Sequence, residues 1–130
     1  MIYMLLIYAS EADWTTKSEA EMAPVMREHE RLEQDLRKGG KYKGCCGLAP
    51  TTAATTVRLG AGKPLTTDGP YAETKEQFGG YYLIEARDLN EAIQVAARIP
   101  GARMGCVEVR PVAQDDQTLR ALRLAPYAGT

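Results

Sequence analysis

The sequence predicts one α+β domain, in which two helices cover one face of an antiparallel sheet. Three observations predict this class. Residues 2–8 are an unbroken apolar segment of strand length, two segments with helical periodicity each begin at a capping motif, and short β-rich segments are bounded by Gly and Pro. The order is strand, helix, strand, hairpin, strand, helix, strand, a βαββαβ sandwich with an extra β-hairpin. At 130 residues the chain can bury a core without disulfides or metal.

The first predicted strand, residues 2–8, reads Ile-Tyr-Met-Leu-Leu-Ile-Tyr. A strand that is apolar at every position is covered on both faces. Because so short a chain can place helices on one face only, we expect the other face to meet a second copy, which makes the protein a homodimer. Periodicity alone leaves a buried helix as the alternative for this segment. Residues 9–17 are expected to be a connection.

The first predicted helix carries the only histidine of the chain. Ser18-Glu19-Ala20-Glu21 has the form of a capping box, and Gly39-Gly40 provides the stop. His29 lies in the middle of an apolar stripe formed by Met22, Val25, Met26, His29, Leu32 and Leu36. Two interpretations stay open: a core histidine with one satisfied nitrogen, or a buried acid/base group.

The middle of the chain is the expected functional centre. Residues 42–48 are predicted as a strand and residues 54–59 and 64–67 as a hairpin, with Pro64 suited to a sheet edge. The hairpin runs into Asp68-Gly69-Pro70, which favours a sharp turn, and a polar loop then leads to Gly79-Gly80. Binding and catalytic groups concentrate in loops held between strands, and glycine pairs in strands often mark close approach of a ligand or another backbone.

The remaining segments complete the domain. Residues 79–86 and 105–112 are predicted strands, and Asp88-Leu89-Asn90-Glu91 begins a second helix that ends at Pro100-Gly101. The expected buried stripe of this helix is Leu89, Ala92, Ile93, Ala96 and Ile99. We therefore expect a domain at residues 1–112, followed by a polar tail at 113–130 that forms at most a short helix or an arm over a neighbour.

Charge and cysteine content argue against several classes of partner. The 16 Lys and Arg residues balance 17 Asp and Glu, so no basic excess favours nucleic acid or a membrane. The apolar start is too short to span a bilayer and lacks the basic flank of a signal peptide, so we expect a cytoplasmic protein. Cys45, Cys46 and Cys106 form no C-x-x-C motif. Even with His29 they are poorly arranged for zinc, because neighbouring strand residues face opposite ways; we expect no metal and no cofactor.

Several segments together resemble one known family. The chain is similar to the YCII-related proteins of the DGPF-domain type over about residues 1–112. The segments that carry the resemblance are Tyr3-Met4-Leu5-Leu6-Ile7-Tyr8, Gly47-Leu48-Ala49-Pro50, Ala54-Thr55-Thr56-Val57-Arg58, Asp68-Gly69-Pro70-Tyr71 with Glu73-Thr74-Lys75-Glu76-Gln77, Gly79-Gly80-Tyr81-Tyr82-Leu83-Ile84 and Val107-Glu108-Val109-Arg110-Pro111.

The resemblance implies a ferredoxin-like subunit of the dimeric α+β barrel superfamily and a bacterial origin. It also implies a catalytic pair, a helix histidine and an aspartate after the hairpin, which match His29 and Asp68 here. Two positions depart from the family pattern. Tyr71 replaces the phenylalanine of the DGPF motif and adds a hydroxyl, while Cys46 stands where glycine or an acidic residue is expected.

Two functions follow from these observations. In the first, a cofactor-independent isomerase, hydrolase or lyase uses Asp68 to orient His29 on a small acidic or lactone-like ligand. Tyr71 and Tyr81 are the expected ligand contacts, and Arg58 or Arg110 could bind a ligand carboxylate, although both arginines also fit a solvated strand face. In the second, the chain is a non-enzymatic ligand-sensing or protein-interaction module, because DGPF-type domains resemble companions of extracytoplasmic-function sigma factors. The position of His29 relative to Asp68 discriminates the two. Hydrogen-bond reach inside an enclosed pocket favours the enzyme, whereas separation by packed apolar side chains favours the module.

Overall fold

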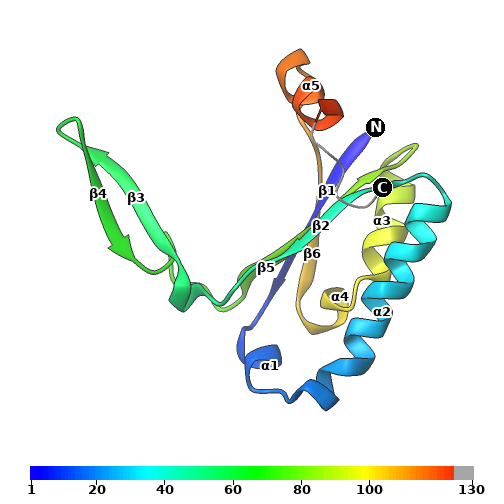
Figure 1. Cartoon of the computed structure of the whole chain (residues 1–130), viewed down its shortest axis with the longest axis horizontal. Coiled ribbons are helices and arrows are strands. Elements are labelled where there is room, and N and C mark those ends of the chain that lie inside the picture. The colour runs from blue at the N-terminus through cyan, green and yellow to red at the C-terminus, as the bar shows by residue number, and fades with distance from the viewer. Residues whose placement is uncertain (125–130) are drawn as a thin grey trace.

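The computed structural model describes residues 1–124 of the chain and shows an α+β fold (Figure 1). Its elements follow the predicted order, with short helices added. They are β1 Ile2–Ala9, α1 Ala12–Thr15, α2 Glu19–Lys38, β2 Tyr42–Gly47, a 3-10 turn at Thr51–Ala53, β3 Thr55–Gly60, β4 Lys63–Asp68, β5 Gln77–Glu85, α3 Leu89–Arg98, α4 Gly101–Met104, β6 Cys106–Pro111 and α5 Asp116–Leu124.

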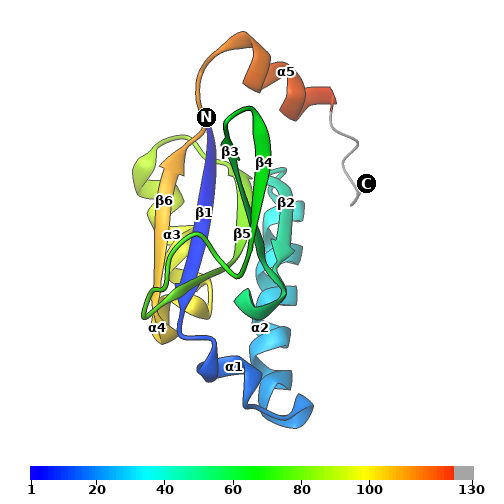
Figure 2. The ribbon, with the colours of Figure 1, turned by 90° about the vertical axis from the view of Figure 1, so that its left-hand side faces the viewer.

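Four strands form the main sheet, in the order β2-β5-β1-β6, with every pair antiparallel. This is the strand order of a ferredoxin-like sandwich, so the predicted fold class is confirmed. Register pairs Tyr3 with Ile84 and Leu5 with Tyr82, which places these four side chains on the same face. Helices α2 and α3 cover that face (Figure 2).

Both predicted helix starts are present. The Ser18 hydroxyl accepts a hydrogen bond from the Glu21 amide at 3.1 Å, and the Glu21 carboxylate accepts one from the Ser18 amide at 3.2 Å. Asp88 accepts from the Glu91 amide at 2.9 Å. Each contact satisfies an amide that the first helical turn would otherwise leave unpaired, which fixes where α2 and α3 begin.

The core lies between these helices and the sheet. Leu5, Ile84, Leu32 and Ile99 are completely buried in it. The predicted stripe of the second helix is partly wrong, because Leu89 and Ile93 are 52% and 47% exposed. The buried apolar residues of α3 are instead Ala92 and Ala96, with Val95 packed against the core and Ile99 buried just beyond the end of the helix.

The predicted hairpin does not join the main sheet. Strands β3 and β4 pair only with each other and form a separate two-stranded sheet. We call residues 55–68 the arm. It extends from the side of the sheet opposite the helices (Figures 1 and 2), and its apolar side chains are exposed, Leu59 by 78%.

Two further segments were only partly predicted. The expected connection at residues 9–17 contains the short helix α1, in which the Thr15 amide bonds to the Glu11 carbonyl at 2.8 Å. The tail forms the short helix α5, while its last residues, 125–130, lie outside the described part. Over residues 1–124, no helix is both long enough and apolar enough to cross a membrane.

Candidate functional site

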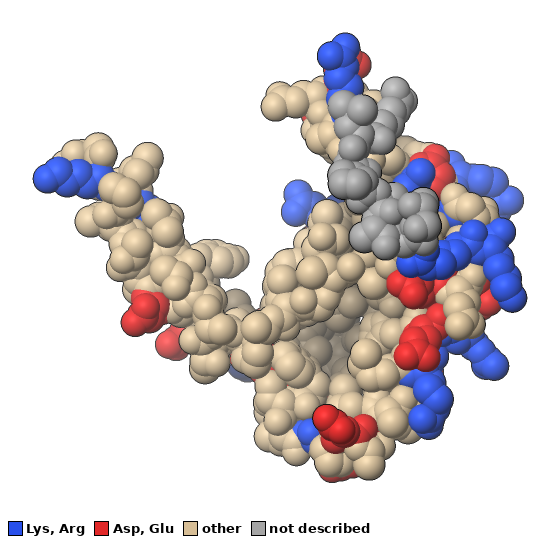
Figure 3. Space-filling model, in the orientation of Figure 1, with Lys and Arg blue, Asp and Glu red and all other residues tan. Residues whose placement is uncertain are grey.

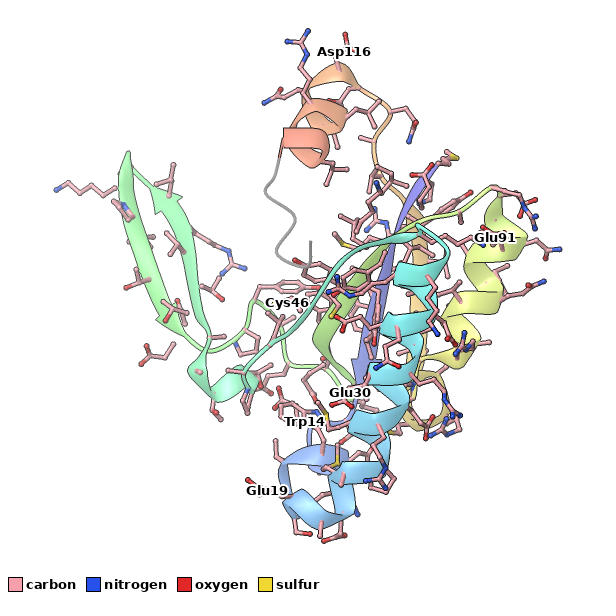
Figure 4. All side chains as sticks on the ribbon, turned by 45° about the vertical axis from the view of Figure 1, so that its right-hand side comes forward. Trp14, Glu19, Glu30, Cys46, Glu91 and Asp116 are labelled. Atoms are coloured by element: carbon pink, nitrogen blue, oxygen red, sulfur yellow. The ribbon has the colours of Figure 1, made fainter. Side chains whose placement is uncertain are left out.

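A pocket of about 430 Å³ lies between α2 and the sheet. One wall is the apolar stripe of α2, with Met22, Val25, Met26 and His29, and Trp14 of α1 and Met104 of α4 complete the apolar lining. Figure 4 shows Trp14, Glu30 and Cys46 around this space, contributed by three different elements. A volume of this size suits a small organic molecule.

Glycines form much of the opposite wall. Gly47, Gly79, Gly80 and Gly101 all line the pocket. A Cβ on Gly80 would lie 2.6 Å from the Cys46 carbonyl oxygen, whereas one on Gly79 would meet nothing within 4 Å. The predicted close approach is therefore real at Gly80, where the neighbouring backbone of β2 makes it, and Gly79 leaves open space.

His29 reaches from α2 to the sheet and meets Tyr82. Its Nδ1 lies 2.6 Å from the Tyr82 hydroxyl, and the two rings are nearly parallel, with centroids 5.8 Å apart and 10° between their planes. Tyr82 is only 3% exposed. One ring nitrogen of His29 thus has a partner, as the core interpretation expects, and the residue also lines the pocket, where its acid/base role stays a prediction.

Burial sets the protonation of this pair. Loss of hydration lowers the pKa of His29, an effect that the nearby Glu28 carboxylate only partly opposes. Burial also raises the pKa of the Tyr82 phenol, and the neighbouring Cys45 and Glu33 add to the rise. At neutral pH, His29 is therefore an uncharged imidazole and Tyr82 a phenol.

The hydrogen bond assigns the tautomer of His29. Among the described residues, His29 is the one side-chain partner that the structure gives to the Tyr82 hydroxyl. Because a buried phenol needs an acceptor for its proton, we assign the phenol as the donor to Nδ1, which places the ring proton on Nε2. His29 can thus donate from Nε2 to a ligand oxygen, while Tyr82 holds the orientation of its ring.

A polar cluster adjoins one end of the pocket. The Tyr42 hydroxyl donates to the Cys45 sulfur at 3.1 Å, and that sulfur lies 3.9 Å from the Glu33 carboxylate. Arg37 approaches Glu33 at 3.5 Å and lies over the Tyr42 ring, 4.5 Å from its centroid. Cys45 and Glu33 also line the pocket, so the cluster marks its polar edge.

The structure places the predicted pair apart within one chain. Asp68 lies at the end of β4 on the arm, is exposed, and is absent from the lining of the His29 pocket. Arg58 lies on β3 of the same arm. The residues after Asp68 border a second hollow of about 400 Å³, lined by Gly69, Pro70, Glu73 and Thr74 among others.

The other predicted ligand contacts divide between two places. Tyr81 lines the His29 pocket. Tyr71 is 79% exposed, and it and Arg110 both lie close enough to the Tyr8 hydroxyl to influence its pKa, which burial chiefly raises. Arg110 lies on the sheet face away from the helices. It pairs across the strands with Met4 of β1, and the side chains of directly paired residues share a face.

Sequence reasoning missed Tyr82 as a site residue. Its alternation with Tyr81 in β5 was visible, but the choice between the two depends on which strand face meets α2. The sequence holds no signal that decides this, because each face of β5 carries a tyrosine and an aliphatic residue, Tyr81 with Leu83 and Tyr82 with Ile84. No group of three or more His, Cys, Asp or Glu residues in the described part could hold a metal ion.

Comparisons with known proteins give a family and a fold. Residues 1–115 match the model of the YCII-related domain. An uncharacterised protein of Rhizobium meliloti (strain 1021) is 40% identical over 115 residues, covering 87% of this chain and 93% of that protein. The structure is similar to that of 5-chloro-2-hydroxyhydroquinone dehydrochlorinase (TftG) from Burkholderia phenoliruptrix AC1100, in complex with 2,5-dihydroxybenzoquinone, with a TM-score of 0.51, 13% identity and coverage of 90% of this chain and 98% of that one.

Proposed function

Because the chain belongs to the family of YCII-related domains, we propose that it binds a small organic molecule between α2 and the sheet and performs acid/base chemistry on it without a cofactor. One observation carries this proposal: His29, held at 2.6 Å by a buried tyrosine, lines a pocket of about 430 Å³. The similar TftG structure holds a small ring compound, which supports a small-molecule role for this fold.

His29 is the proposed catalytic residue. Its neutral ring donates from Nε2 to a carbonyl or hydroxyl oxygen of the ligand and polarises the bonds beside that oxygen. Tyr82 acts as a positioning residue, because it prevents rotation of the imidazole. The reaction class is isomerisation, hydrolysis or elimination, and the sequence leaves small acids and lactone-like compounds as ligand classes.

A thermal-shift screen tests the proposed pocket. Small lactones, phenols and carboxylic acids are screened against the wild type, His29→Ala and Lys63→Ala, a control at the exposed start of β4. We expect compounds that raise the melting temperature of the wild type and of Lys63→Ala but not of His29→Ala. Identical hits for all three proteins would refute a His29 site.

A homodimer is the proposed state of the protein in solution. Tyr3 and Leu5 of β1 are buried under the helices, whereas Met4, Leu6 and Tyr8 on the other face stay partly exposed. Figure 3 shows few charged side chains on the concave side between the arm and the body, and many over the helices. A sheet face with three partly exposed apolar side chains is the kind of surface that a second copy covers, and Glu108 and Arg110 of β6 are the charged residues that share it.

Within such a dimer, Asp68 of a second copy is the candidate partner of His29. Asp68 pairs with Thr55 at the foot of the arm, whereas the turn at residues 60–63 is its far end. The second copy would therefore have to dock against this foot for the Asp68 carboxylate to approach its pocket. Replacing Cys45, Cys46 and Cys106 by Ser gives a background for the double variant His29→Cys/Asp68→Cys. Oxidation should give a covalent dimer on a non-reducing gel, and a cross-link confined to the monomer band would contradict this arrangement.

The arm also favours a second candidate function, a protein-interaction module. Val57 and Leu59 are exposed on one face of this two-stranded sheet, and Leu65 is exposed on the other. Under this alternative a purified extracytoplasmic-function sigma factor of the same organism binds the wild type and His29→Ala equally, and Leu59→Asp weakens the complex. Absence of a complex with wild type would exclude this partner.

A further inference from the structure

The charged side chains that line the His29 pocket are both negative. Glu30 and Glu33 of α2 both belong to its lining. Among the described residues, no Lys or Arg lines the pocket. An anion bound there would therefore meet no positively charged side chain in the lining. Figure 4 shows Glu30 beside the space between α2 and the sheet.

Nearby groups offset this negative charge only in part. Arg37 lies 3.5 Å from Glu33, yet its guanidinium stacks over Tyr42 outside the pocket lining. For Glu30, no ion pair appears among those of the described residues. His29 adds no positive charge near neutral pH, because burial lowers its pKa.

The shape of the pocket narrows the ligand further. Methionine and valine side chains of α2 line one wall, and glycine backbone forms much of the other. Where the glycines leave the backbone bare, between side chains such as Ile7 and Tyr82, a flat ring can lie against the peptide groups, and the apolar wall favours contact with its other face. The polar groups that face such a ring are few, with His29 among them.

We propose that the pocket selects an uncharged ring compound with a carbonyl or hydroxyl oxygen that accepts from His29 Nε2, and that Glu30 and Glu33 exclude carboxylates. This inference rests on the proposed function and decides between its two ligand classes in favour of the lactone-like one.

Three probes of matched size and different charge test this selectivity. They are 4-hydroxybenzamide, which is neutral, 4-hydroxybenzoate, which is anionic, and 4-hydroxybenzamidine, which is cationic. Dissociation constants are measured by titration calorimetry at pH 7 and low ionic strength. Two carboxylates at the pocket edge should make the anion bind about tenfold more weakly than the amide, and added salt should reduce that difference.

Variants identify the source of the discrimination. In Glu30→Gln/Glu33→Gln we expect the preference for the amide over the benzoate to fall about tenfold, because both repelling charges are gone. The control Glu19→Gln/Asp116→Asn removes the same charge from the first turn of α2 and from α5, outside the pocket lining, and should keep the preference.

Three outcomes distinguish failure of the proposed charge selectivity from failure of the proposed His29 pocket. An amide preference that falls only in the glutamate variant supports it. Equal or tighter binding of the benzoate by the wild type, lost in His29→Ala, would overturn the inference and leave the proposed pocket intact. Binding of all probes that is unaffected by His29→Ala, or no binding of any probe, would overturn both.

Discussion

His29 and Tyr82 determine the chemistry of the pocket at the scale of single residues. Burial lowers the pKa of the imidazole, which keeps it uncharged at neutral pH, and the phenol that contacts it at 2.6 Å is buried more deeply still. Each residue compensates the other, since a buried polar group without a partner would destabilise the fold. The pair is therefore a part of the core, and in the proposed function it also provides the reactive group of the pocket.

Tyr82→Phe should destabilise the fold modestly. It removes the hydroxyl but keeps the ring that stacks on His29, and it leaves Nδ1 buried without its donor. We expect the free energy of unfolding to fall by about 1 kcal/mol in urea titrations at pH 7. Tyr81→Phe, the neighbouring position on the other strand face, is the matched control and should change it less. Equal losses in the two variants would contradict the assigned hydrogen bond.

The lowered pKa of His29 predicts a pH dependence of stability. Because the unfolded state binds the proton more readily, stability from the neutral ring is present above the unfolded pKa of about 6.5 and is lost as the pH falls through the folded value. Between pH 7 and pH 5 the wild type should therefore lose more free energy of unfolding than His29→Gln. Parallel losses would show that the ring is not desolvated in the folded state.

At the scale of elements, backbone contacts made possible by glycine shape the pocket wall. Gly80→Ala places a methyl group against the Cys46 carbonyl oxygen, so β2 and β5 must separate. We expect a loss of about 1–3 kcal/mol in the free energy of unfolding. In contrast, Gly79→Ala meets open space and should change it by less than about 0.5 kcal/mol. Equal effects would mean that the strand spacing is not limited at Gly80.

The elements were largely predictable because local chemistry determines them. Ser18 and Asp88 mark helix starts through contacts with residues three positions away, and the apolar run of β1 needs no distant information. Contacts between elements were less predictable. Alternation in β5 separates Tyr81 from Tyr82 but does not reveal which side chain meets α2. The hairpin signal at residues 54–67 likewise gives the pairing of β3 with β4, but not its detachment from the main sheet.

At the scale of the whole molecule, two apolar surfaces are left without a partner in one chain. One is the sheet face opposite the helices, and the other is the arm. The predicted partnership of His29 and Asp68 belongs to this scale, because it needs a second copy docked against the foot of the arm, where Asp68 lies. Whether the two groups meet is therefore a question about assembly and stays a prediction.

Leu6→Lys should prevent the proposed dimer. It introduces a charge into the sheet face beside Tyr81 and Glu108, which a second copy would have to bury. Light scattering after gel filtration should give a dimer for the wild type and a monomer for Leu6→Lys. Gln94→Lys adds the same charge on the exposed side of α3 and should remain dimeric. A wild-type monomer would contradict the proposed assembly.

Nitrogen NMR of the single histidine tests the central claim most directly, namely that His29 contacts the ligand from the wall of the pocket. In tag-free protein at pH 7, the ring should show a protonated Nε2 and an Nδ1 that accepts a hydrogen bond. Saturation with 4-hydroxybenzamide should shift the Nε2 resonance while Nδ1 keeps its state. If the amide raises the melting temperature while both ring nitrogens stay unchanged, the ligand binds elsewhere and the account is wrong.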